Sequence, residues 1–61
     1  MNYIERNSLL ATGRKLAQQD ATIMPEQFAA GYKYWTDREK AVIERGYFRA
    51  VRKMAKEARN G

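Results

Sequence analysis

Residues 36–58 read TDREKAVIERGYFRAVRKMAKEA, and this segment carries the strongest structural signal in the chain. Thr36 and Glu39 have the spacing of a capping box, in which two side chains satisfy free amides at the start of a helix. The pattern therefore predicts a helix over 37–58. Apolar residues recur along it at intervals of three and four, which places them on one face. They are Ile43, Tyr47, Ala50, Val51, Met54, Ala55 and Ala58.

The opposite face of this predicted helix is basic. It carries five cations at helical spacing, which are Arg38, Arg45, Arg49, Arg52 and Lys56. The whole net charge of +5 belongs to residues 38–61, because residues 1–37 contain as many acidic as basic side chains. Such asymmetry indicates either a surface that binds a polyanion, such as nucleic acid, or an ordinary solvated face. The sequence leaves both interpretations open.

Two shorter helical patterns precede this one. Asn2 is a good N-cap residue, and the apolar periodicity after it predicts a helix over 3–19. Gly13 lies on the apolar face of that helix, where it is either simply tolerated or allows another helix to approach closely. Pro25 suits the first turn of a helix over 25–35. An alternative is that this helix and the next form one bent helix.

The segment between the first two predicted helices, 21–24, favours extended structure. Thr22 and Ile23 are β-branched, and the residue before a proline is biased away from helix. A lone strand lacks hydrogen-bond partners. The segment is therefore either a short strand that pairs with its own copy across the two-fold axis of a homodimer, or a plain extended connector. The predicted fold class is all-α, with two to three helices per subunit in a single domain over 1–61.

Six of the seven aromatic residues fall between positions 28 and 48, and they are Phe28, Tyr32, Tyr34, Trp35, Tyr47 and Phe48. All except Tyr34 and Phe48 fit the apolar stripes, so we expect those four to form a core between the second and third helices. Tyr34 lies off its stripe and Phe48 at the edge of its own. We expect these two to be partly exposed, in a dimer seam or in a cleft that receives a partner's helix. Stacking on single-stranded bases is a further alternative.

The chain has 61 residues, without cysteine or histidine. So small a domain is marginally stable alone, and disulfides, thiolate zinc sites and imidazole ligands are all excluded. Association with a second copy is the support that remains, so we expect a homodimer. The acidic residues are scattered and the single serine has no base, so we expect no enzymatic activity, cofactor, metal or small-molecule substrate. Apolar runs are too short for a membrane helix, no signal peptide is recognisable, and we expect a cytoplasmic protein.

Two further segments read MNYIERN, at 1–7, and PEQFAAGY, at 25–32. They are similar to the very small early-region proteins of lambda-like temperate bacteriophages, encoded between the exonuclease and excisionase genes. The resemblance implies a small, dimeric, non-enzymatic protein that is made early in infection, acts in the host cytoplasm and favours lytic development. Its expected partner is a host protein, reached through the apolar and aromatic cleft. The alternative is a nucleic-acid-binding regulator that uses the basic helix face.

Overall fold

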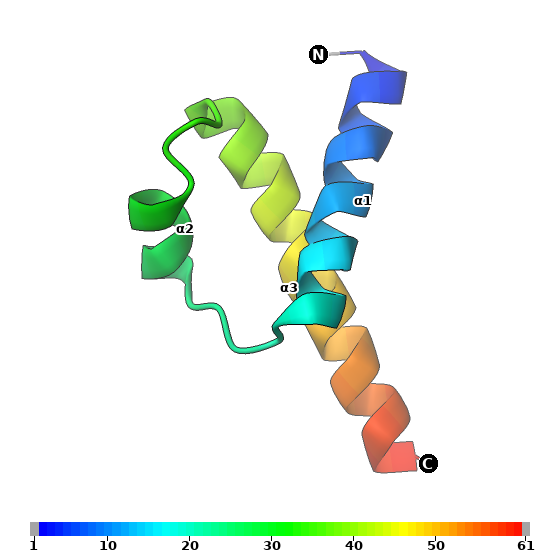
Figure 1. The fold of residues 1–61 in the computed structure, drawn as a ribbon. Coiled ribbons are helices and arrows are strands. Elements are labelled where there is room, and N and C mark those ends of the chain that lie inside the picture. The colour runs from blue at the N-terminus through cyan, green and yellow to red at the C-terminus, as the bar shows by residue number, and fades with distance from the viewer. Residues whose placement is uncertain (1, 61) are drawn as a thin grey trace.

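The computed structural model describes residues 2–60, so Met1 and Gly61, at the ends of the predicted domain, lie outside the described residues. The described chain folds into three α-helices and contains no strand: α1 spans Tyr3–Gln19, α2 spans Pro25–Gly31 and α3 spans Asp37–Asn60. α1 and α3 run in the same general direction and cross near their middles, and α2 lies to one side (Figure 1). The Cα positions span 36 × 26 × 14 Å, so the helices form a flat plate.

The helices begin where the capping residues predict. The Glu5 amide donates to Asn2 Oδ1 over 2.8 Å at the start of α1. At the start of α3, the Thr36 amide donates to Glu39 Oε1 over 2.9 Å and the Glu39 amide donates to Thr36 Oγ1 over 3.1 Å. This reciprocal pair is the predicted capping box. Pro25 lies in the first turn of α2, as expected.

The second helix is shorter than predicted. It ends at Gly31 and not at residue 35, and a loop over 32–36 separates it from α3, so the two are not one bent helix. The capping box explains why α3 is a separate helix, because an N-cap residue such as Thr36 is itself outside the helix that it caps. The Trp35 amide donates to the Tyr32 carbonyl and closes a turn there. α3 also continues two residues beyond the predicted end at 58, to Asn60.

α1 and α3 cross with their backbones in direct contact, and a glycine from each helix makes this possible. A Cβ atom at Gly13 would lie 2.1 Å from the Ile43 carbonyl oxygen and 2.6 Å from the Tyr47 amide nitrogen. A Cβ atom at Gly46 would lie 2.6 Å from the Leu10 carbonyl oxygen. These spaces are too small for any side chain, so the crossing requires glycine on both helices. Of the two interpretations of Gly13, close helix approach is confirmed.

A small core lies between the crossing and α2. Its fully buried side chains are Ala17, Phe28, Ile43 and Tyr47. Half-buried apolar residues from α1, α3 and both loops surround them, including Leu16, Ile23 and Val51. Four buried hydrophobic residues are a modest core even for a chain of this length, so the fold depends on each of them.

The Tyr47 hydroxyl ties the loop between α1 and α2 to the core. It donates to the Asp20 carbonyl over 2.7 Å and accepts from the Ile23 amide over 2.8 Å. The Thr22 amide and hydroxyl donate to the Asp20 carboxylate, and these two hydrogen bonds lower the pKa of Asp20. The Met24 amide donates to Gln27 Oε1. This loop is therefore fixed by side chains from its own chain.

The same hydrogen bonds bear on the predicted strand at 21–24. In the single chain this segment is a turn followed by extended residues. Its amides at 22, 23 and 24 already donate to side-chain oxygens within the chain. A ribbon formed with a second copy would have to exchange some of these bonds for inter-strand ones. The strand across a dimer axis stays a prediction.

The glycine crossing can be tested with two alanine substitutions. Gly13→Ala should lower the free energy of unfolding by about 2–3 kcal/mol or more, because the new methyl group meets backbone atoms that no rotamer change can move. Gly31→Ala is the matched control, since nothing lies within 4 Å of its Cβ position. It should be neutral or stabilising by up to about 1 kcal/mol. Urea denaturation followed by circular dichroism measures both, and similar effects at the two glycines would contradict the crossing.

The role of the Tyr47 hydroxyl can be tested without changing the volume of the core. Tyr47→Phe should destabilise the fold by about 1–3 kcal/mol, because a partly buried amide and a carbonyl both lose their partner. Tyr34→Phe removes the same hydroxyl from a side chain that is 75% exposed, and it should change stability by less than about 0.5 kcal/mol. Thermal unfolding of the two variants gives the comparison. Equal stability of the two would show that the hydroxyl does not hold the loop.

Candidate functional site on the basic face of α3

The five predicted cations of the basic face all lie on α3 and are all exposed to solvent; they are Arg38, Arg45, Arg49, Arg52 and Lys56. The first and last are about 27 Å apart along the helix axis, because an α-helix rises 1.5 Å per residue. The structure therefore presents one long row of cations on the surface. We call this row of five cations the basic face.

Packing on the other sides of α3 explains why the basic face points outward. α1 contacts the side of α3 that contains Ile43 and Gly46. The α2 residue Phe28 contacts the side that contains Tyr47 and Phe48, with ring centroids 5.1 and 6.0 Å apart. The remaining side points away from both contacts, although Arg38 and Arg49 border hollows that residues of α1 also line. This side carries the five cations and one apolar residue, the half-buried Val42.

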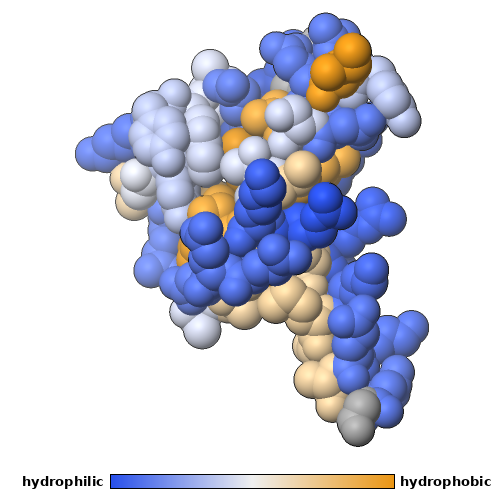
Figure 2. All heavy atoms as spheres, turned by 45° about the vertical axis from the view of Figure 1, so that its right-hand side comes forward, coloured by the Kyte–Doolittle hydropathy of each residue, from blue (hydrophilic) through white to orange (hydrophobic). Residues whose placement is uncertain are grey.

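The last turns of α3 extend beyond the rest of the molecule. α3 passes the end of α1 and projects away from it (Figure 1), and residues 55–60 are all exposed. The projecting end is two-sided in Figure 2, with hydrophilic side chains along one edge and weakly hydrophobic ones along the other. The part of the basic face that Arg52 and Lys56 occupy is therefore accessible to a large partner.

Neighbouring cations on the basic face repel one another. Arg45 and Arg49 are four residues apart, as are Arg52 and Lys56, so each pair lies side by side on the helix surface. Such like-charge pairs destabilise a helix by about 0.2–0.5 kcal/mol each. A bound polyanion would turn this repulsion into attraction. The arrangement favours anion binding over helix stability.

The six aromatic residues lie together, as edge-to-face and stacked neighbours. Ring centroids of successive neighbours are 4.6 to 5.3 Å apart in the row Tyr34, Trp35, Tyr32 and Phe28. Phe28 in turn contacts the rings of Tyr47 and Phe48. Phe28 and Tyr47 are fully buried, Tyr32, Trp35 and Phe48 are half-buried, and only Tyr34 is largely exposed. These side chains pack against one another as a core, with one exposed edge formed by Tyr32, Tyr34 and Trp35.

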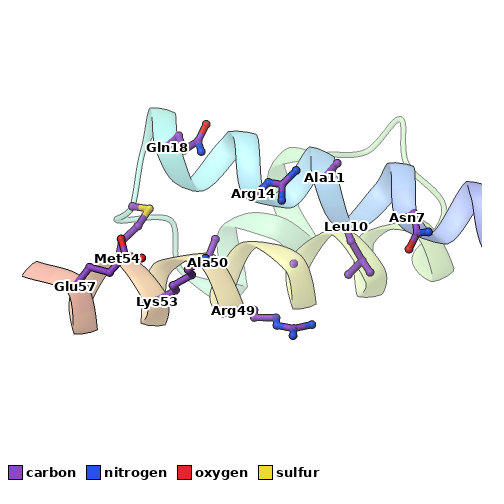
Figure 3. Close-up of a pocket in the computed structure, with 11 residues that line it drawn as sticks. Asn7, Leu10, Ala11, Arg14, Gln18, Arg49, Ala50, Lys53, Met54 and Glu57 are labelled. Carbon is purple, nitrogen blue, oxygen red and sulfur yellow. The ribbon is translucent and has the colours of Figure 1, made fainter.

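A groove that sequence reasoning missed lies between α1 and α3. Its volume is about 640 Å³ (Figure 3). Half-buried apolar side chains form its floor, namely Leu10, Ala11, Ala50 and Met54. Exposed charged side chains form its rim, namely Arg14, Arg49, Lys53 and Glu57. None of the six aromatic residues lines it, so it is distinct from the predicted aromatic cleft. Only Arg49 belongs to both the rim and the basic face.

Other kinds of site find no support in the described residues. Residues 2–60 contain no group of three or more acidic side chains placed to hold a metal ion. No helix in this part of the chain is long and apolar enough to cross a membrane. No family model, curated protein or solved structure matches the chain.

Proposed function

We propose that this chain is a non-enzymatic regulatory protein that binds nucleic acid through the basic face of α3. The observation that carries the proposal is the exposure of all five cations on one side of a 24-residue helix. Four of the five are arginines, whose planar guanidinium groups suit phosphates and guanine edges. The resemblance to small phage early proteins supports a regulatory role in the cytoplasm of an infected host.

In the proposed complex, contacts between the cations and phosphates contribute most of the affinity for nucleic acid. A helix fits the major groove of duplex DNA, and cations along its sides reach the flanking phosphates. The basic face carries no asparagine or glutamine, the side chains that pair with adenine. Binding is therefore strong at low salt, weak at high salt and only slightly dependent on base sequence.

A host protein is the second candidate partner, and the exposed edge of the aromatic cluster favours it. Tyr34 is 75% exposed and lies edge-on to Trp35, at 5.0 Å between ring centroids. Exposed aromatic side chains of this kind are enriched at protein interfaces. We rank this candidate below nucleic acid, because most of the aromatic surface that the sequence assigned to a cleft is packed in the core.

Charge reversal on the basic face tests the first candidate. Arg45→Glu combined with Arg52→Glu should abolish binding to duplex DNA, because two phosphate contacts are replaced by repulsion. For the unmodified chain, five phosphate contacts predict a slope of roughly −4.5 in log affinity against log salt. Fluorescence anisotropy of a labelled duplex at several salt concentrations measures both quantities. The absence of binding by the unmodified chain at low salt would contradict the proposal.

The matched control reverses two exposed cations of α1, Arg6→Glu with Lys15→Glu, and alters the net charge by the same amount. It should weaken binding modestly through the overall field and leave the salt slope nearly unchanged. If the α1 variant loses as much affinity as the α3 variant, only net charge matters and the basic face is not the site.

Tyr34→Ala separates the two candidates. If a host protein docks on the aromatic edge, Tyr34→Ala should lose that protein in an affinity capture from nuclease-treated host lysate, and the Arg45 and Arg52 double variant should keep it. If nucleic acid is the partner, material captured by the unmodified chain should disappear after nuclease treatment, and Tyr34→Ala should behave as the unmodified chain does.

A further inference from the structure

The groove between α1 and α3 has an apolar floor and a rim that is mainly basic. Arg14 lies on the α1 side of the rim, and Arg49 and Lys53 lie on the α3 side. Glu57 is the one acidic side chain among the described residues that line the groove. An occupant that covers the floor and neutralises the rim must therefore combine apolar groups with negative charge.

The groove has the dimensions of a binding site for a protein segment. Its lining runs from Asn7 to Gln18 on α1 and from Gly46 to Glu57 on α3, and the two helices form its two walls (Figure 3). Each stretch covers about 16 Å, because an α-helix rises about 1.5 Å per residue. Gly46 already packs against the backbone of Leu10. An occupant therefore reaches the floor with its side chains and keeps its own backbone above the rim.

Two other kinds of occupant match the groove less well. A second copy of this chain would bring the same three rim cations against Arg14, Arg49 and Lys53, and like charges that face each other oppose binding. Nucleic acid has the complementary charge, but proteins contact it mainly through its phosphates and sugars. Those groups would leave the apolar floor without an apolar partner.

We propose that the groove binds an acidic amphipathic helix of a different protein, about three turns long. Apolar side chains along one stripe of that helix cover the floor, as in other complexes in which a helix lies in a groove. Carboxylates on one flank of the stripe pair with Arg14, and those on the other flank pair with Arg49 and Lys53. The two arginines make the stronger contacts, because a guanidinium group can bind a carboxylate through two parallel hydrogen bonds. A basic residue at one end meets Glu57 and sets the direction of the bound helix.

This site is separate from the two surfaces considered under the proposed function. Arg14 and Lys53 do not belong to the basic face, and the exposed aromatic edge contributes no residue to the groove. Arg49 is the one lining residue that the groove shares with the basic face. The proposal is therefore independent of nucleic-acid binding.

A synthetic peptide tests the proposal. The probe is an alanine-based helix of about four turns, with leucine at i, i+4, i+7 and i+11 and glutamate on both sides of that stripe. One control peptide carries lysine in place of glutamate, and the other carries glutamine in place of leucine. Fluorescence anisotropy at physiological salt should show roughly micromolar binding of the acidic peptide to the unmodified chain, and binding of both controls should be weaker by about tenfold or more. Failure of the acidic peptide to bind would overturn the proposal.

Two matched double variants test whether the peptide binds in the groove. Arg14→Glu with Lys53→Glu should raise the dissociation constant of the acidic peptide by about tenfold or more, because two exposed attractions become repulsions. Arg6→Glu with Lys15→Glu makes the same charge change outside the groove. It should alter the dissociation constant by less than about twofold, since charges are screened over roughly 8 Å at physiological salt. Circular dichroism checks that both variants are folded, and equal losses of affinity in the two would overturn the proposal.

Amide chemical shifts of the unmodified chain show which surface the peptide covers. The acidic peptide should shift the amide signals of Ala11, Ala50 and Met54 and leave that of Tyr34 unchanged. Shifts at Tyr34 with none in the groove would place the peptide on the aromatic edge and would overturn the proposal.

Two further outcomes would assign the groove to a different occupant and so overturn the proposal. If the groove signals shift when the chain alone is concentrated, a second copy occupies the groove. The variant with Arg45→Glu and Arg52→Glu keeps the groove rim intact. If duplex DNA displaces the acidic peptide from that variant, the groove binds nucleic acid. Loss of duplex binding by that variant without displacement of the peptide is the result that both proposals predict.

Discussion

The contact between the backbones of α1 and α3 is the constraint on which the rest of the structure depends. Gly13 and Gly46 each cost about 1 kcal/mol of helix propensity, yet they let two helices touch where any side chain would hold them apart. The contact fixes α3 near its middle. α2 then closes over the adjacent side of α3, through Phe28. The one side of α3 that neither helix covers is the side that carries the cations.

The small core determines which side chains are used for packing and which remain on the surface for binding. With four fully buried hydrophobic residues among residues 2–60, the fold uses five of its seven aromatic side chains for packing, while Tyr3 and Tyr34 stay exposed. The Tyr47 hydroxyl does more than fill space, because it also holds the loop between α1 and α2. What remains for binding is the surface: a row of cations, an exposed aromatic edge and a groove beside the crossing. Each of these surfaces lies outside the buried core.

The sequence predicted those features of the fold that depend on neighbouring residues, and it did not predict those that depend on contacts between distant residues. The capping box at Thr36, the proline at 25 and the segregation of cations to one face of α3 each follow from spacing alone. The end of α2 at Gly31 was missed, because the aromatic stripe continues through Trp35 while the backbone leaves the helix. The groove was missed because it arises from how α1 and α3 cross. The pair Gly13 and Gly46 was its one signal, since each glycine lies within a predicted helix.

The most direct test of this account is a nuclear Overhauser measurement on the unmodified chain, between the α-protons of Gly13 and the amide proton of Tyr47. One α-proton of Gly13 occupies the direction in which a Cβ atom would lie 2.6 Å from the Tyr47 nitrogen. Backbone contact between α1 and α3 predicts a strong cross-peak between these protons, which belong to residues thirty-four positions apart in the sequence. If the α-protons of Gly13 give cross-peaks only to residues of α1, the two helices do not meet there. The exposure of the basic face would then not be explained by the contact between α1 and α3.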